Sequence, residues 1–240
     1  MEFMSNSARR AQRMSAFVAD NQIISVRAYN VIMGLVVLYG LVVNFILCAT
    51  VGPYIYYSMN PVILIIGYFV LALAGTFIAI KSDNAAISFL GYNLVVLPLG
   101  IMLSGVVSAY GGVSSSVIVE AVYYTMLVTA IMVLAAACFP GLFSRLGGVL
   151  FAALIGLVFA SFFTSIFSAF TGIYFGRGYA FIGAIIFSLY IGYDFYRSQQ
   201  FPKTMDNAVD CALDIYLDIV NLFLYIVRII GNGSSNSRAR

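Results

Sequence analysis

The sequence contains no histidine and no tryptophan, and only 9% of its 240 residues are charged. Histidine is the commonest metal ligand, and its unperturbed pKa lies near physiological pH. Its absence excludes a histidine-based metal centre and leaves carboxylates to carry any response to pH. The scarcity of charge separates the chain from soluble domains, in which about a quarter of the residues are charged.

Cysteine is also scarce, and its spacing excludes two further classes of site. Cys48, Cys138 and Cys211 lie far apart within apolar segments and form no CxxC pair. The sequence therefore indicates neither a disulfide framework nor a zinc site, and we interpret the three cysteines as core residues. The net charge of +3 is small, with basic residues mostly scattered at the ends of segments, so no nucleic-acid partner is expected.

Long apolar runs are what the sequence has in abundance. Hydrophobic residues make up 62% of the chain, and the mean hydropathy is +1.01. The runs are continuous and about twenty residues long, which is the length that crosses a bilayer as an α-helix. We therefore predict an all-α polytopic membrane protein with seven transmembrane helices. The predicted spans are residues 31–51, 62–80, 85–109, 117–139, 146–170, 179–196 and 208–230.

The loops and basic residues predict the domain organisation and the orientation. Residues 1–30 are expected to form a cytoplasmic N-terminal arm, residues 31–231 the transmembrane domain, and residues 232–240 a disordered tail. Eight of the 12 basic residues fall on the side of the N-terminus, which favours a cytoplasmic N-terminus and an external C-terminus. An alternative in which the last segment is re-entrant stays open. The bacterial plasma membrane is the expected location.

Four aspartates break the apolar pattern near the end of the chain: Asp194, Asp210, Asp214 and Asp218. A carboxylate at the centre of a transmembrane helix costs about 2.5 to 3.5 kcal/mol. Ionisable residues at such positions are functional hypotheses by default. Because the last helix carries three of the four, we predict that it lies centrally and is surrounded by the other six helices.

The polar residues of this last helix share one face. With Asp210 set at zero, the angles around the helix are about 40° for Asp214, about 80° for Asp218, about 20° for Asn221, about 60° for Tyr225 and about 0° for Arg228. The stripe is about 27 Å long, close to the thickness of the hydrocarbon layer. The pattern predicts a membrane helix with one wet or paired side.

Asp194 lies on the preceding span, and the short connection around Pro202 makes an antiparallel hairpin of the two helices. Two carboxyl groups in contact share a proton, so such a pair responds to pH without histidine. Approximate depths along the two helices, about 9 Å for Asp194, about 10 Å for Asp214 and about 16 Å for Asp218, favour Asp214 as the partner.

The segments SLYIGYDFYRSQQ and ALDIYLDIVNLFLYIVRIIG resemble the last two helices of the transmembrane Bax inhibitor motif family, which carry a YD and a LYLDxxNLF signature. The resemblance implies that Asp194 and Asp218 are the family's sensor aspartates. It also implies a pH-sensitive calcium leak channel, in which the protonated pair closes the cytoplasmic side. Lys81 stands near the place of a basic residue in the family, and the extra acids Asp210 and Asp214 leave the partner of Asp194 open.

A calcium path needs oxygen ligands, which Asp194, Asp214, Asp218 and Asn221 supply. A leak has to release its ion, so transient Ca²⁺ contacts and no tightly bound cofactor are expected. Glu120 is a candidate entry carboxylate, with solvation at the membrane interface as the alternative. Arg228 is a candidate lock at the outer end, and Asp210 either joins the stripe or is solvated at the interface.

Other classes of function remain as alternatives. A proton-coupled transporter also uses carboxylates within its spans. A non-conducting regulator of other membrane proteins is a further alternative, which would make such proteins its partners beside the lipid bilayer, Ca²⁺ and protons. An intramembrane aspartyl protease also pairs two aspartates, but the sequence has no glycine-flanked aspartate and no later Pro-Ala-Leu turn. We expect a monomer that is not an enzyme.

Overall fold

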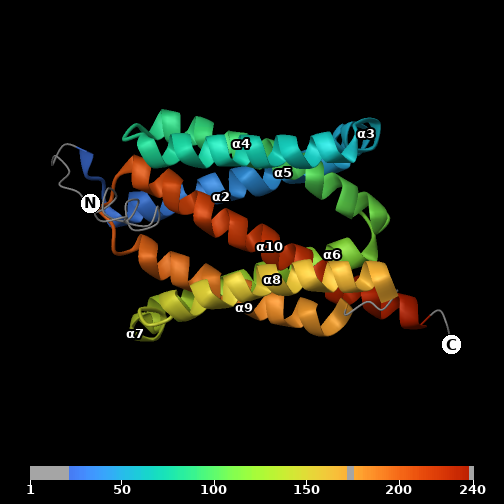
Figure 1. The fold of residues 1–240 in the computed structure, drawn as a ribbon. Coiled ribbons are helices and arrows are strands. Elements are labelled where there is room, and N and C mark those ends of the chain that lie inside the picture. The colour runs from blue at the N-terminus through green and yellow to red at the C-terminus, as the bar shows by residue number, and fades with distance from the viewer. Residues whose placement is uncertain (1–21, 172–175, 238–240) are drawn as a thin grey trace, which may run out of the picture. The chain divides into compact units, whose positions relative to one another are not determined.

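The computed structural model describes residues 22–171 and 176–237, and in these ranges the chain is helical with no β-strand (Figure 1). The chain divides into two compact units. The first contains Met1–Val113 and Ser198–Tyr216, and the second contains Ser114–Arg197 and Leu217–Arg240. The predicted all-α fold is confirmed for the described residues.

The first unit consists of α2 (Val26–Ala49), α3 (Gly52–Ser58), α4 (Pro61–Lys81), α5 (Ala85–Ala109) and the beginning of α10 (Met205–Ser237). Helix α5 packs against α2, α3 and α4. Short polar side chains begin these apolar helices, because Ser25, Asn60 and Asn84 each accept a hydrogen bond from a backbone N–H of the first turn. The core of this unit includes the fully buried rings of Tyr29, Tyr92 and Tyr216.

The second unit consists of α6 (Ser116–Cys138), α7 (Pro140–Phe143), α8 (Gly147–Thr171), α9 (Gly176–Ser198, except its last residue) and the rest of α10. Gly192 of α9 lies against the ring of Phe143, and Gly147 of α8 lies against the ring of Tyr193. Small residues at these positions let neighbouring helices approach closely, which is how helices associate within a membrane.

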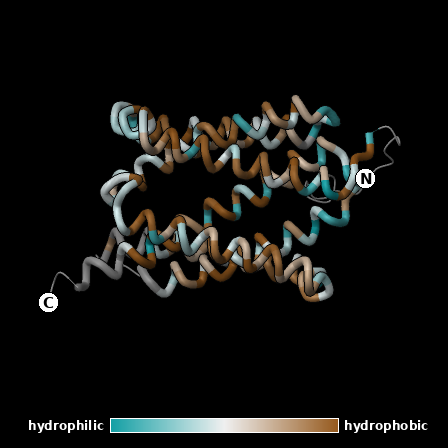
Figure 2. Tube along the Cα trace, turned by 180° about the vertical axis from the view of Figure 1, so that it is seen from behind, coloured by the Kyte–Doolittle hydropathy of each residue, from teal (hydrophilic) through white to brown (hydrophobic). Residues whose placement is uncertain are grey.

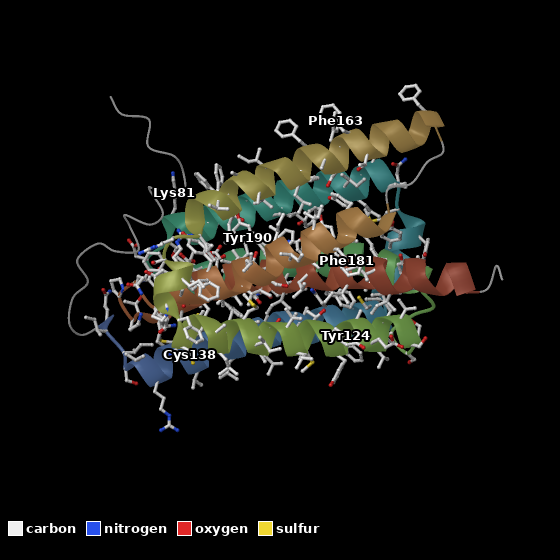
Figure 3. All side chains as sticks on the ribbon, turned by 90° about the horizontal axis from the view of Figure 1, so that it is seen from below. Lys81, Tyr124, Cys138, Phe163, Phe181 and Tyr190 are labelled. Atoms are coloured by element: carbon white, nitrogen blue, oxygen red, sulfur yellow. The ribbon has the colours of Figure 1, made fainter. Side chains whose placement is uncertain are left out.

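Six of the described helices are long and apolar enough to cross a membrane, so this is a multi-pass membrane protein. They are α2, α4, α5, α6, α8 and α9. Figure 2 shows hydrophobic residues along most of their length and hydrophilic residues mainly near loops and helix ends. Large apolar side chains are exposed on them, such as Phe163 of α8, which is 63% exposed and points away from its helix (Figure 3). Helix α10 is not among the six, because its aspartates lower its hydropathy. A seventh span through α10 remains a prediction, and so does its central position.

The structure corrects several predicted boundaries. Helix α2 begins at Val26, because Ser25 caps it there, so the predicted arm ends within a helix; residues 1–21 of that arm lie outside the described residues. Helix α10 begins at Met205 and runs to Ser237, past residue 231, where the transmembrane domain was predicted to end. Extending an existing helix adds one hydrogen bond per residue without a new nucleus, so a helix can outlast its apolar stretch. Residues 238–240 lie outside the described part.

Candidate functional site in helices α9 and α10

Asp194 and Asp218 both belong to the second unit. Asp194 lies on α9 and is partly exposed, whereas Asp218 lies on α10 and is only 7% exposed. Tyr190, one helical turn before Asp194 and labelled in Figure 3, interacts electrostatically with both carboxyl groups. One phenol therefore links the two aspartates that the family resemblance selects.

Asp210 and Asp214 belong to the first unit and share a different tyrosine. Tyr29 of α2 interacts electrostatically with both, and its hydroxyl lies 3.3 Å from the Sγ atom of Cys211. Asp210 is fully buried and Asp214 is partly exposed. The four acids are thus divided between two tyrosines, one in each unit.

The connection between α9 and α10 is held by Lys203. In the sequence this residue stood out only as one of the basic residues that predict the orientation. The Nζ atom of Lys203 donates hydrogen bonds to the backbone oxygens of Ser198 at 3.2 Å, Gln199 at 2.8 Å and Phe201 at 2.9 Å. It also lies 4.8 Å from the ring centre of Tyr29. Burial lowers the pKa of this amine from its ordinary value of 10.5. A cation at the end of a helix satisfies carbonyls that have no partner within it.

Helix α2 and Ile24, which precedes it, also support the same connection. The Tyr29 hydroxyl donates to the Ser198 oxygen at 3.1 Å, and the backbone N–H of Ile24 donates to the Lys203 oxygen at 2.8 Å. The Gln199 side chain donates to the Asn30 side chain at 2.9 Å. We call Tyr29, Ser198, Gln199 and Lys203 the connection clamp. No sequence motif marks it, because its members are distant in the chain and bind mostly backbone atoms.

The remaining candidate residues lie in varied settings. Asn221 is partly exposed and donates to the Leu217 oxygen of its own helix at 2.8 Å. Glu120 is exposed in the first turns of α6. Lys81, the last residue of α4, is exposed with its Nζ 4.5 Å from the ring centre of Phe77. Arg228 is exposed and lies 5.4 Å from the ring centre of Tyr225.

Two observations bear on ligands of the acids. Among the described residues, no group of three or more histidine, cysteine or acidic side chains could hold a metal ion. Asp206, which the sequence reasoning missed, accepts a hydrogen bond of 2.6 Å from the Ser88 hydroxyl. An acid in the first turn of a helix is a recognisable signal, because it complements the helix dipole.

Residues 21–235 match the model of a protein family described as "Inhibitor of apoptosis-promoting Bax1". The chain belongs to the Bax inhibitor family. This confirms the resemblance drawn from the α9 and α10 segments, and the match covers nearly all of the described residues.

Individual members of the family match shorter stretches. Bax inhibitor 1 of Saccharomyces cerevisiae is 43% identical over 60 residues, which are 25% of this chain and 20% of the yeast protein. An uncharacterized protein of Helicobacter pylori (strain ATCC 700392 / 26695) is 49% identical over 49 residues, 20% of each chain. The same figures hold for a protein of strain J99. These matches span a fifth of the length of each relative.

Proposed function

We propose that this protein is a pH-sensitive calcium leak channel whose gate is the pair Asp194 and Asp218. The observation that carries the proposal is the position of Tyr190 on α9. Its phenol interacts electrostatically with Asp194 of the same helix and with Asp218 of α10. In this proposal α10 is the seventh span, and its polar stripe faces protein, because a charged face is costly in lipid.

The gate follows from the chemistry of two neighbouring carboxyl groups. With one shared proton the pair is hydrogen-bonded and holds the two helices together. Loss of that proton leaves two like charges, which repel each other in a site of low dielectric constant. The closed state therefore belongs to acidic conditions and the open state to alkaline ones, and with the N-terminus in the cytoplasm the gate lies at the cytoplasmic side.

The permeating ion needs oxygen atoms along its way and no tight site. Calcium accepts carboxylate, amide and water oxygens in flexible geometry. Asp218, Asn221 and Asp214 offer such oxygens along the stripe, with Glu120 as an entry carboxylate and Arg228 at the outer end. Asp214 remains the second choice for the partner of Asp194.

The experiment is a calcium flux assay in proteoliposomes. The rate is expected to rise with pH over roughly 6 to 8, the range in which a shared proton is lost. Asp194→Asn and Asp218→Asn remove that proton equilibrium, so each should flatten the dependence. Asp83→Asn is the matched control, because Asp83 is an exposed aspartate in the loop after α4. An equal leak from empty liposomes would rule out the channel.

A second candidate function is the regulation of another membrane protein without conduction. It is favoured by the description of the matching family, which names inhibition of a protein that promotes apoptosis. Purified protein that binds a membrane-protein partner but passes no calcium at any pH would select this candidate over the channel.

A further inference from the structure

Three hydroxyl groups of the second unit meet around Tyr225 of α10. The hydroxyl of Tyr225 lies 2.9 Å from that of Tyr179 on α9, and the Tyr179 hydroxyl is hydrogen-bonded to that of Ser161 on α8. Ser161 in turn donates to the Leu157 oxygen of its own helix at 2.9 Å. We call Ser161, Tyr179 and Tyr225 the hydroxyl cluster. It joins three helices through one chain of hydrogen bonds.

The ring of Tyr225 is tightly packed. It is 8% exposed and stacks on Phe187 at 5.7 Å between ring centres. Gly183 of α9 leaves the space for it, because a Cβ atom at residue 183 would collide with the Tyr225 ring. The guanidinium of Arg228 lies over the same ring, 5.4 Å from its centre. A side chain held in this way keeps its hydroxyl in one place.

The hydroxyl cluster lies on the polar stripe, away from the aspartate pair. Tyr225 follows Asp218 by about 10 Å along α10, and Tyr179 precedes Asp194 by about 22 Å along α9. The hydroxyl groups of the cluster are hydrogen-bonded to one another, so they are not arranged as ligands for a calcium ion, which requires six to eight oxygen atoms. In the proposed channel, an ion or a file of water along the stripe has to pass this chain of hydroxyls, and the packed rings of Tyr225 and Phe187 supply the apolar surface with which a hydrophobic constriction resists wetting.

We infer that the hydroxyl cluster is a second closure, which seals the polar stripe of α10 on the Arg228 side independently of the aspartate pair. The pair makes opening depend on protons, and the cluster sets how often water and ions reach the pair from the other end. This inference rests on the proposed calcium leak for its meaning in transport, while the closure itself can be measured without calcium.

The first test is the reactivity of a cysteine placed behind the closure. Asn221→Cys puts a thiol one turn before Tyr225, and labelling of residue 221 by a hydrophilic maleimide is read by peptide mass in proteoliposomes. Adding Tyr225→Phe should raise the labelling rate about fivefold, the factor that corresponds to one hydrogen bond. Tyr124→Phe is the matched control, because Tyr124 of α6, the residue labelled in Figure 3, is 46% exposed. An unchanged rate in a folded Tyr225→Phe variant would overturn the closure.

A second variant separates a cluster from two unrelated tyrosines. Tyr179→Phe breaks the bond to Tyr225 and also the bond to Ser161, so it should raise the rate at least as much as Tyr225→Phe, and adding Tyr225→Phe to it should raise the rate little further. Additive effects would overturn the inference, because they would mean that the two hydroxyls act separately.

Calcium flux then distinguishes this inference from the proposed function. Tyr225→Phe should raise the leak at every pH and leave the shape of its pH dependence unchanged, whereas the aspartate variants change that shape. A protein that passes no calcium would remove the channel while the labelling result still decides the closure. A pH-dependent leak with labelling and flux both unaffected by Tyr225→Phe would remove the closure alone.

Discussion

Tyr190 is the residue that relates two acidic side chains from different helices. Its phenol interacts electrostatically with Asp194 and with Asp218, and it is partly buried on α9. The Tyr190 hydroxyl is polar, so at this range it can stabilise the charged form of a carboxyl group. Tyr190 is thus placed to set the pH at which the proposed pair loses its proton.

Removal of that hydroxyl should therefore delay opening. Tyr190→Phe keeps the ring and removes the polar hydroxyl, so the rise of the calcium flux is expected to move to higher pH with its shape retained. The measurement is the midpoint of flux against pH in proteoliposomes, with Tyr124→Phe as the control. A midpoint that stays in place, or moves to lower pH, would show that the phenol does not favour the charged pair.

Lys203 allows a prediction about stability. Lys203→Met removes three hydrogen bonds to backbone oxygens and leaves these oxygens without the amine. The expected loss is about 1 to 3 kcal/mol, because part of it is recovered by water at this half-exposed site. The measurement is unfolding in detergent together with hydrogen exchange of residues 198–207. Lys203→Arg retains the charge and should lose less.

The pH dependence of this contribution has a definite sign. Because burial lowers the pKa of Lys203 below its ordinary 10.5, the unfolded chain binds a proton at this residue more strongly than the folded chain does. Stability therefore rises with pH between the lowered pKa and 10.5. As the pH rises through this window, the free energy of unfolding of the parent protein should increase relative to that of Lys203→Met. A constant difference would contradict the shift.

Among the elements, α2 has two roles in the first unit. Its N-terminal turns supply Tyr29 to the connection clamp and Asn30 as the acceptor for Gln199, and its middle packs against the rings of Tyr92 and Tyr216 at Gly40. The Asn44 side chain donates to the Tyr216 hydroxyl at 2.6 Å. The first part of α10 therefore contacts α2 at two places, through Cys211 with Tyr29 and through Tyr216 with Asn44.

Two glycines of α2 offer a matched test of this packing. A Cβ atom at Gly40 would collide with the Tyr92 hydroxyl, whereas one at Gly34 would have nothing within 4 Å. Gly40→Ala should destabilise the fold by about 1 to 3 kcal/mol through overpacking. Gly34→Ala should be neutral or stabilising by up to about 1 kcal/mol, because alanine favours the helix. Thermal unfolding of both variants measures the difference, and equal effects would mean that α2 does not pack closely at Gly40.

For the whole molecule, the number of membrane crossings depends on whether α10 spans the bilayer. Six helices meet the requirements of length and composition without it. Seven crossings place the two ends of the chain on opposite sides, and six place them on the same side. The proposed function requires seven, since the polar stripe can carry ions across the bilayer only if α10 spans it.

The prediction is that tags at the two ends are reached from opposite sides. In sealed vesicles of known orientation, a protease or an impermeant label should reach an N-terminal tag from the cytoplasmic side and a C-terminal tag from the other side. The control is permeabilised vesicles, in which both tags react. Reaction of both tags from one side would make α10 a re-entrant or interfacial helix.

The sequence by itself determined the class of the protein, most of its helices and the stripe on α10. Hydropathy, helical period and capping residues act over neighbouring positions, so residues 85–109 were predicted with the same bounds as α5. The family followed from the YD and IYLDIVNLF segments for the same reason, because each is a continuous run.

Only the tertiary structure decided which side chains are neighbours. Asp218 interacts electrostatically with Tyr190, whereas Asp210 and Asp214 interact with Tyr29, although all three aspartates share one helical face. The connection clamp and the hydroxyl cluster have no sequence signal, because contacts between distant segments depend on how helices pack. Helix period places a residue on a face, and packing alone determines what that face meets.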